Sequence, residues 1–324
     1  MYQRFYGLRE APFELTPNPK FLYLTPQHRE ALSNLEYGLS SAKAATVLIG
    51  EAGTGKTTLL KAALASERCT GVTCVYIGNP ALTRTEFVET LAQRFALSPE
   101  ASRSKAVLLT ELEAVLRERR DRGEITALLV DEAQTLSVEL LEEVRLLANI
   151  ETTSQKLLPL VLAGQPELAP RLNDPELRQL KQRIALRCEL KPFSIAETAT
   201  YIAMRIRTAG GEASRLFTRE AVTLIHEHSR GIPRTISVIC DNALVTGMAL
   251  GKRPVGQDIV LEVCRDFDLA AQRAAESGLG TFDLEVSRSS GAAPEALTGE
   301  DEATEDAGDG KPERSVRPLG FGRR

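Results

Sequence analysis

Short apolar runs alternate with amphipathic stretches up to about residue 190. An apolar run bounded by polar or glycine-rich segments is typical of a buried strand, and apolar residues three or four apart are typical of a helix. We therefore predict strands at 47–49, 72–77, 127–130, 157–163 and 184–190, and helices at 27–41, 58–65, 83–95, 107–119 and 137–150. Thr83 and Glu86 have the spacing of a capping box at the start of the third of these helices. Such alternation builds a parallel sheet with helices on both faces, so we predict an α/β fold.

The pattern changes after residue 173, where one last strand is followed only by helices. Asp174 and Pro175 are typical of a helix start, and Ser194 with Glu197 forms a capping box. Beyond it we predict helices at 195–209, 219–230, 233–250 and 257–274. We therefore expect a sheet domain at 27–191 and a small all-helical domain at 192–274.

The two ends of the chain differ from these domains. Residues 1–26 are rich in aromatic residues and prolines, so we expect an arm that packs on the sheet domain rather than a long helix. Residues 275–324 hold eleven acidic and six basic residues among Gly, Ser, Ala and Pro. A segment of this composition cannot bury enough apolar area to order itself, so we expect a disordered acidic tail.

Composition narrows the class of protein. The chain has 324 residues, 43% of them hydrophobic and 26% charged, with a net charge of −4 that the tail accounts for. The near-neutral body offers no basic field of the kind that announces nucleic-acid binding. We find no signal peptide and no apolar run long enough to span a membrane, so we expect a cytoplasmic protein. Five cysteines without paired spacing favour free thiols over disulfides or a zinc site.

The clearest chemical signal follows the first predicted strand. Gly50-Glu51-Ala52-Gly53-Thr54-Gly55-Lys56-Thr57, with Thr58 after it, fits the pattern G-x-x-x-x-G-K-[ST] between a strand and a helix. In this context the backbone N–H groups can surround a phosphate chain at a helix N-terminus. Lys56 would supply positive charge to the phosphates and Thr57 a hydroxyl to Mg²⁺. The alternative is a glycine-rich turn with a chance lysine.

A second signal is the acidic pair that ends the third predicted strand. Asp131 follows four apolar residues and can hold Mg²⁺ beside the glycine loop, and Glu132 stands where a general base could act on water. The alternative is an ordinary strand end with solvated acids. Gln165 ends the next strand and could fix the water, and Arg234 begins a helix from which it could reach the phosphates. Taken singly, each of these two is more often structural.

These segments together carry a resemblance to a known family. The stretches FYGLREAPFELTPNPKFLYL, GEAGTGKTTLL, LLVDEAQTLS, LVLAGQPEL, LKQRIALRCELKPFS and GIPRTISVICDNAL span about residues 1–270. They resemble the AAA+ ATPases of the ExeA/GspA family, general secretion pathway protein A, and its relatives in exopolysaccharide and exosortase loci. The resemblance implies a P-loop NTPase (AAA+) three-layer sheet domain followed by a helical lid, with ATP and Mg²⁺ as ligands.

The resemblance also implies individual roles. Asp131 and Glu132 correspond to the Walker B pair, Gln165 to sensor 1 and Arg234 to sensor 2. Asn79 is expected to restrain Glu132 until a partner binds. Arg183 resembles an arginine finger that acts on a neighbouring subunit, which implies a homo-oligomer. Arg178 and Arg187 are rival fingers, and Arg183 could instead pair with a nearby acid such as Glu176.

The chain departs from the family's secretion members at its C-terminus. Those members carry a transmembrane helix and a periplasmic peptidoglycan-binding part, whereas this sequence has a short acidic tail, which favours the soluble relatives. We expect an ATPase that drives or regulates assembly of an envelope secretion or exopolysaccharide export system, in the cytoplasm or at the inner membrane through a partner. The alternatives are a DNA-associated ATPase resembling transposition helpers such as TniB, and a nucleotide-gated scaffold with negligible turnover.

Overall fold

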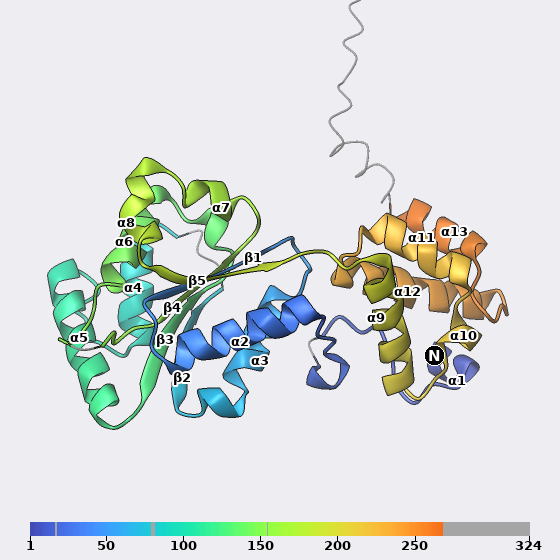
Figure 1. Ribbon diagram of the computed structural model, residues 1–324, viewed down its shortest axis with the longest axis horizontal. Helices are drawn as coiled ribbons and strands as arrows, with labels where there is room; N and C mark the ends of the chain where they lie inside the picture. Colours follow the sequence, from blue (N-terminus) through green and yellow to red (C-terminus); the bar gives the residue numbers. More distant parts are fainter. Residues whose placement is uncertain (17, 79–81, 154, 268–324) are drawn as a thin grey trace, which may run out of the picture. The chain divides into compact units, whose positions relative to one another are not determined.

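A computed structural model describes residues 1–16, 18–78, 82–153 and 155–267 of the protein. Within these residues, five strands form one all-parallel sheet. The strands are β1 (Ala45–Gly50), β2 (Val72–Ile77), β3 (Ile125–Val130), β4 (Leu160–Gly164) and β5 (Ile184–Leu190), in the spatial order β2-β3-β4-β1-β5 (Figure 1). The predicted α/β fold is thereby confirmed. Asn79 and the predicted tail lie outside the described residues.

Helices cover both faces of the sheet. The helices α2 (Pro26–Ser40) and α3 (Lys56–Leu64) pack on one face, where Leu48 and Leu129 point. The helices α4 (Arg84–Arg94), α5 (Lys105–Asp121) and α6 (Val138–Leu147) pack on the other, where Val47 and Val130 point (Figure 1). Successive residues of a strand face opposite sides, so each central strand contributes to two apolar cores.

Side-chain caps fix where several helices begin. Thr83 and Glu86 form a capping box at α4, and Ser194 and Glu197 form one at α9 (Ile195–Thr208), as the sequence predicts. Ser137 accepts a hydrogen bond from the backbone N–H of Leu140 at the start of α6. These caps satisfy backbone donors that have no partner inside the helix.

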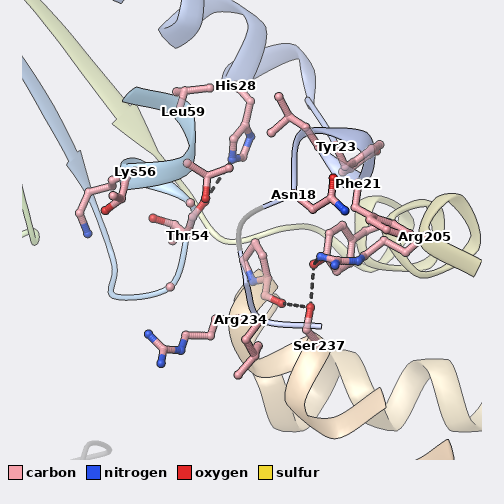
Figure 2. A pocket seen from close by; sticks show the side chains of 18 of the residues that line it. Asn18, Phe21, Tyr23, His28, Thr54, Lys56, Leu59, Arg205, Arg234 and Ser237 are labelled. Atoms are coloured by element: carbon pink, nitrogen blue, oxygen red, sulfur yellow. Dashed lines mark hydrogen bonds between the residues drawn. The ribbon is translucent and has the colours of Figure 1, made fainter. Parts of the chain in front are cut away.

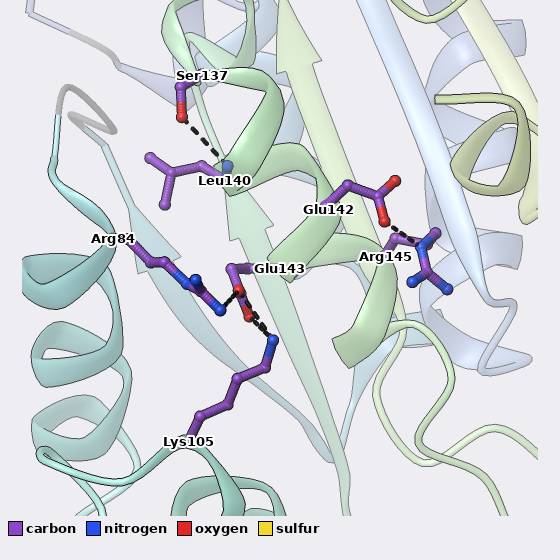
Figure 3. Close-up of polar contacts among 7 residues, drawn as sticks. All are labelled: Arg84, Lys105, Ser137, Leu140, Glu142, Glu143 and Arg145. Atoms are coloured by element: carbon purple, nitrogen blue, oxygen red, sulfur yellow. Dashed lines mark hydrogen bonds and ion pairs between the residues drawn. The ribbon is translucent and has the colours of Figure 1, made fainter. Parts of the chain in front are cut away.

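One buried carboxylate joins three helices on the same face of the sheet. Glu143 of α6 is only 8% exposed, and it receives Arg84 of α4 and Lys105 of α5, each with an N–O distance of 2.7 Å (Figure 3). Two cations on one buried carboxylate offset the cost of removing it from water. The network therefore fixes α4 and α5 relative to the helix that follows the end of β3.

The chain after β5 forms helices only, within the residues described. They are α9, α10 (Ala213–Leu216), α11 (Arg219–Ser229), α12 (Pro233–Ala249) and α13 (Gln257–Asp266). Between β4 and β5 the chain forms α7 (Leu168–Arg171) and α8 (Arg178–Lys181), with a 3-10 turn at Pro175–Leu177 where Asp174 and Pro175 indicate a helix start. No helix in the described ranges combines the length and the apolar character needed to cross a bilayer.

The arm packs with these helices, which corrects the expectation that it packs on the sheet domain. The arm forms α1 (Tyr2–Tyr6) and a 3-10 turn at Pro19–Phe21, and its buried aromatic residues share one core with α9 and α12. The backbone N–H of Arg9 donates to the carbonyl of Ala209 over 2.8 Å. Helices already cover both faces of the sheet, whereas the helical core is completed by the arm's aromatic side chains.

Candidate functional site

The glycine loop connects β1 to α3. Gly53 and Gly55 have φ of +83° and +100°, a backbone conformation that glycine adopts without steric cost. A Cβ on Gly50 would lie 2.9 Å from the backbone carbonyl oxygen of Leu190, so only glycine allows β5 to approach this closely. The sequence therefore folds here into the strand, loop and helix that the motif requires.

Lys56 lies at the first position of α3 and folds back over the loop. Its Nζ donates to the carbonyl oxygens of Gly50 at 2.7 Å and Glu51 at 3.1 Å, and the residue is 5% exposed. Burial lowers the pKa of Lys56, while the negative charges of Glu132 and Asp131 act in the opposite direction. The loop thus presents a cation and a helix N-terminus together, which suits a phosphate chain.

Asp131, at the end of β3, lies against the start of α3. Its Oδ2 accepts hydrogen bonds from the Thr57 hydroxyl at 2.7 Å and from the Tyr76 hydroxyl at 2.9 Å, and the residue is 3% exposed. Burial and the bond to Asp131 raise the pKa of Tyr76 to about 12. The hydroxyl of Thr57 and the carboxylate of Asp131 lie side by side and are oxygen ligands of the kind that Mg²⁺ prefers, so these two residues fit Mg²⁺. Tyr76 was not anticipated from the sequence.

Glu132 is held in an uncommon backbone conformation with φ of +53°. Its Oε2 accepts from Gln134 Nε2 at 2.7 Å and from Gln165 Nε2 at 3.2 Å. These bonds, chiefly the one from Gln134, and the charge of Lys56 lower the pKa of Glu132 against the effect of burial. The structure therefore brings Glu132 and Gln165 together, and it adds Gln134, which the sequence reasoning missed. Its only signal there is its position two residues after the acidic pair.

Arg234 meets the glycine loop at the first turn of α12. Its backbone N–H donates to the Gly53 carbonyl at 3.2 Å, and a Cβ on Gly53 would lie 2.8 Å from the Cβ of Arg234. Figure 2 shows the exposed guanidinium extending beyond the loop that carries Lys56. Arg234 therefore lies against the predicted phosphate-binding loop, as we expect from the sequence for a residue that reaches the phosphates.

A pocket of about 470 Å³ lies beside the loop (Figure 2). Its walls come from the loop and α3, from the arm and from the helices after β5. Tyr23, Phe193 and Tyr201 contact one another there in edge-on and tilted arrangements, with ring centroids 5.5–6.1 Å apart. His28 also lines the pocket, and its Nε2 lies 3.3 Å from the Thr54 carbonyl oxygen. The pocket therefore combines a polar, cationic wall with an aromatic one.

Arg183 does not join this group within the chain. It precedes β5, and the register places Ile184 beside Ala45, whereas the glycine loop follows the opposite end of β1 at Gly50. Arg183 acts instead on Glu151: the pKa of Glu151 is lowered, chiefly by Lys156, and the charge of Arg183 contributes. The rivals Arg178 and Arg187 are exposed.

Comparison with known proteins identifies the family. Residues 39–172 match the family model described as "AAA domain". Over 255 residues the chain is 40% identical to general secretion pathway protein A of Aeromonas hydrophila. The chain is an AAA+ protein of the ExeA/GspA family. The matched region covers 79% of this chain and 46% of that relative, so the chain spans about half the length of the curated relative that it matches.

Solved structures of several other proteins share the fold. The Aeropyrum pernix ORC2 protein in its ADPNP-ADP complexes matches with a TM-score of 0.58 at 17% identity, over 84% of this chain and 75% of that one. Drosophila ORC bound to DNA matches with a TM-score of 0.60 at 21% identity, over 82% and 66%. The Walker-type ATPase of Pyrococcus abyssi matches with a TM-score of 0.54 at 20% identity, over 83% and 80%. At these identities the likeness concerns the fold alone.

Proposed function

We propose that the protein binds Mg-ATP at the glycine loop and hydrolyses it. The observation that carries the proposal is the 2.7 Å hydrogen bond between Thr57 and Asp131, which joins two motifs 74 residues apart. The bond holds these two oxygen ligands at the N-terminus of α3, and the negative charge of Asp131 also acts on Lys56. Bound to Thr57 and Asp131, Mg²⁺ would supply positive charge to the phosphate oxygens.

The remaining residues then take distinct roles in hydrolysis. Glu132 accepts a proton from the attacking water, and the side-chain amide of Gln165 helps to fix that water. Arg234 contributes positive charge to the phosphates from the helical part. Residues 50–58 bind the phosphate chain through backbone N–H groups and Lys56. Asn79, outside the described residues, stays a prediction from the family resemblance, as the residue that restrains Glu132.

The aromatic wall of the pocket suits the nucleoside. Tyr23, Phe193 and Tyr201 offer ring faces and edges on which a purine can stack. A pocket of about 470 Å³ lies within the range that small ligands occupy in proteins. Since its walls include the arm and helical residues as well as the loop, bound nucleotide would contact both parts of the chain.

We also propose that a neighbouring subunit completes the site. Arg183 lies directly before β5, at the edge of the sheet away from its own glycine loop. It would therefore act on the nucleotide of the next copy in a homo-oligomer. A guanidinium suits that role because it is always charged and presents a fork of donors. Hydrolysis would then require assembly.

We further propose that hydrolysis drives or regulates assembly of an envelope secretion or exopolysaccharide export system, through a partner at the cytoplasmic side of the inner membrane. The support is the 40% identity to general secretion pathway protein A. A DNA-associated role has less support, because two arginines of the helical part that could contact DNA are engaged within the protein. Arg205 donates to backbone carbonyls of the arm, and Arg215 pairs with Glu212 at 2.7 Å.

The test measures binding and turnover separately. Lys56→Ala should weaken binding of a fluorescent ATP analogue strongly, whereas Lys61→Ala, an exposed lysine of α3, should not. Glu132→Gln should bind Mg-ATP and lose turnover, because the amide cannot accept the proton. Wild-type affinity in Lys56→Ala, or wild-type turnover in Glu132→Gln, would overturn the assignment.

A further inference from the structure

Gln134 connects the ends of two neighbouring strands through one side-chain amide. Its Oε1 accepts a hydrogen bond from the backbone N–H of Gln165, after β4, at 2.9 Å. A backbone N–H can only donate, so the orientation of the amide is determined, and its NH₂ group must face the other way. There Nε2 donates to Oε2 of Glu132, after β3, at 2.7 Å.

The surrounding residues leave room for this amide and hold its backbone. A Cβ on Gly164 would lie 3.0 Å from Oε1 of Gln134 and 2.8 Å from Cδ2 of Leu168, so a larger residue would crowd the position. The guanidinium of Arg171 donates to the carbonyl oxygens of Gln134 and Leu136. Gln134 is therefore held at two points: Arg171 binds its backbone carbonyl, and Glu132 and Gln165 bind its side chain.

The anchored amide acts on a carboxylate in an uncommon conformation. Glu132 has φ of +53°, which few residues other than glycine adopt without cost. The amides of Gln134 and Gln165 both donate to Oε2 of Glu132, at 2.7 and 3.2 Å. Two donors on one oxygen restrict rotation of the carboxylate, and the shorter bond comes from Gln134.

We propose that Gln134 is a positioning residue, which aims the carboxylate of Glu132 and ties it to Gln165. The inference rests on the proposed ATPase function and deepens it. Glu132 and Gln165 then move as one unit, because the same amide bonds to both. The side chain of Gln134 bonds to Glu132 and to the backbone of Gln165, so we expect its loss to lower the rate of hydrolysis and to leave nucleotide affinity intact.

Two variants of Gln134 separate its two bonds. Gln134→Ala removes both, whereas Gln134→Glu keeps an oxygen for the N–H of Gln165 and places a carboxylate oxygen against Glu132. Both should lower kcat on the order of 10²-fold, as expected for a misplaced catalytic group. The Kd for Mg-ATP should stay within about threefold, because uniform binding is untouched. Gln93→Ala, an exposed glutamine of α4, should match the wild type.

A double-mutant cycle distinguishes positioning from a general structural role. If Gln134 acts through Glu132, then Gln134→Ala should cost nothing further in a Glu132→Gln background, since the group it aims is absent. Losses that multiply in the double variant, a wild-type kcat in Gln134→Ala, or a loss of affinity equal to the loss of kcat would each overturn the inference. Melting temperatures within a few degrees of wild type identify variants that are folded.

The proposed function fails in a different way. If the wild-type protein does not hydrolyse ATP, or if Glu132→Gln alone keeps wild-type turnover, the ATPase assignment falls whatever Gln134 does. If Glu132→Gln is inactive while Gln134→Ala behaves as wild type, only the role of Gln134 falls.

Discussion

The backbone N–H of Arg234 donates to the carbonyl of Gly53 over 3.2 Å, so the helix α12 begins directly on the glycine loop. The approach leaves no room for a side chain at position 53, because a Cβ on Gly53 would lie 2.8 Å from the Cβ of Arg234. A change in the conformation of the loop must therefore be accommodated by the first turn of α12. This contact connects the proposed phosphate site directly to the helices after β5.

We predict that Arg234→Ala slows hydrolysis more than it weakens binding. The variant keeps the Cβ and the backbone bond to Gly53 and loses the rest of the side chain with its guanidinium, so the loop should stay intact. Loss of one charge that stabilises the transition state should lower kcat on the order of 10²-fold. Arg234→Lys should recover part of the rate, since it restores charge without the fork of donors.

Single-turnover hydrolysis and analogue binding measure the two effects. Arg207→Ala, an exposed arginine of α9, is the matched control and should behave as wild type. A kcat unchanged in Arg234→Ala would remove this residue from the catalytic site.

The arm is attached through Arg205, and we predict that Arg205→Lys destabilises the protein. The guanidinium donates to the Pro12 carbonyl at 2.5 Å and to the Tyr201 hydroxyl at 2.6 Å, and it lies 5.1 Å from the ring centroid of Phe21. A lysine cannot reproduce both the planar stacking and the fork of donors. The unfolding free energy should fall by about 2–3 kcal/mol.

Denaturant unfolding followed by tyrosine fluorescence measures this loss. Arg207→Lys, two residues away on an exposed position of α9, should unfold as the wild type does. Equal stability in the two variants would show that the arm is held by its aromatic residues alone.

The sequence predicts the sheet well where a local pattern determines the structure. The bounds of β2 and β5 agree with the predicted ranges, and both capping boxes form as expected. The strand predicted at 157–163 begins later, at Leu160, because Pro159 has no N–H for the ladder. The glycine loop and the acidic pair were found because their spacing and flanking strands are local features.

The parts that the sequence did not predict depend on contacts between distant segments. Gln134 is one glutamine in a loop, and its role follows only from the pairing of Val130 with Leu162, which brings the ends of β3 and β4 together. Tyr76 looks like an ordinary strand residue until its hydroxyl is seen on Asp131. The arm's aromatic residues indicate burial, but no periodicity tells which core receives them.

A pH dependence should follow from His28, which is 5% exposed. The Thr25 hydroxyl lies 2.7 Å from its Nδ1, and its Nε2 lies 3.3 Å from the Thr54 carbonyl oxygen. Burial lowers the pKa of His28 below its ordinary value of 6.5, against smaller opposite effects from that carbonyl and from Glu197. As pH drops below 6.5, His28 is protonated in the unfolded chain before it is protonated in the folded protein. Stability should therefore fall from pH 6.5 down to the pKa of His28 in the folded state.

His28→Gln removes the titrating group and keeps a donor for the Thr54 carbonyl. Melting temperatures measured from about pH 8 to pH 5 should therefore fall less steeply in this variant than in the wild type. At the alkaline end the two proteins should melt within a few degrees of each other. Parallel curves over the whole range would show that His28 does not contribute to the pH dependence.

The last prediction concerns action between subunits. Arg183 and Lys56 should belong to different halves of one shared site, because Arg183 lies at the start of β5, away from its own glycine loop. Arg183→Ala and Lys56→Ala should each be inactive alone, and an arginine supplied by a neighbour is worth roughly 10³–10⁵ in rate. A mixture of the two can rebuild sites that take Lys56 from one subunit and Arg183 from the next.

The recovered activity has a definite size. In an equimolar mixture with random neighbours, about a quarter of the sites in a closed ring should combine an intact Lys56 with an intact Arg183. ATPase activity measured against mixing ratio should therefore peak near equal amounts. Arg178→Ala and Arg187→Ala, tested in place of Arg183→Ala, identify the finger if it is one of these exposed neighbours. No recovery at any ratio, with mixed oligomers confirmed by labelled subunits, would contradict action in trans. Normal hydrolysis by Arg183→Ala alone would leave this residue the simpler role of balancing the charge of Glu151.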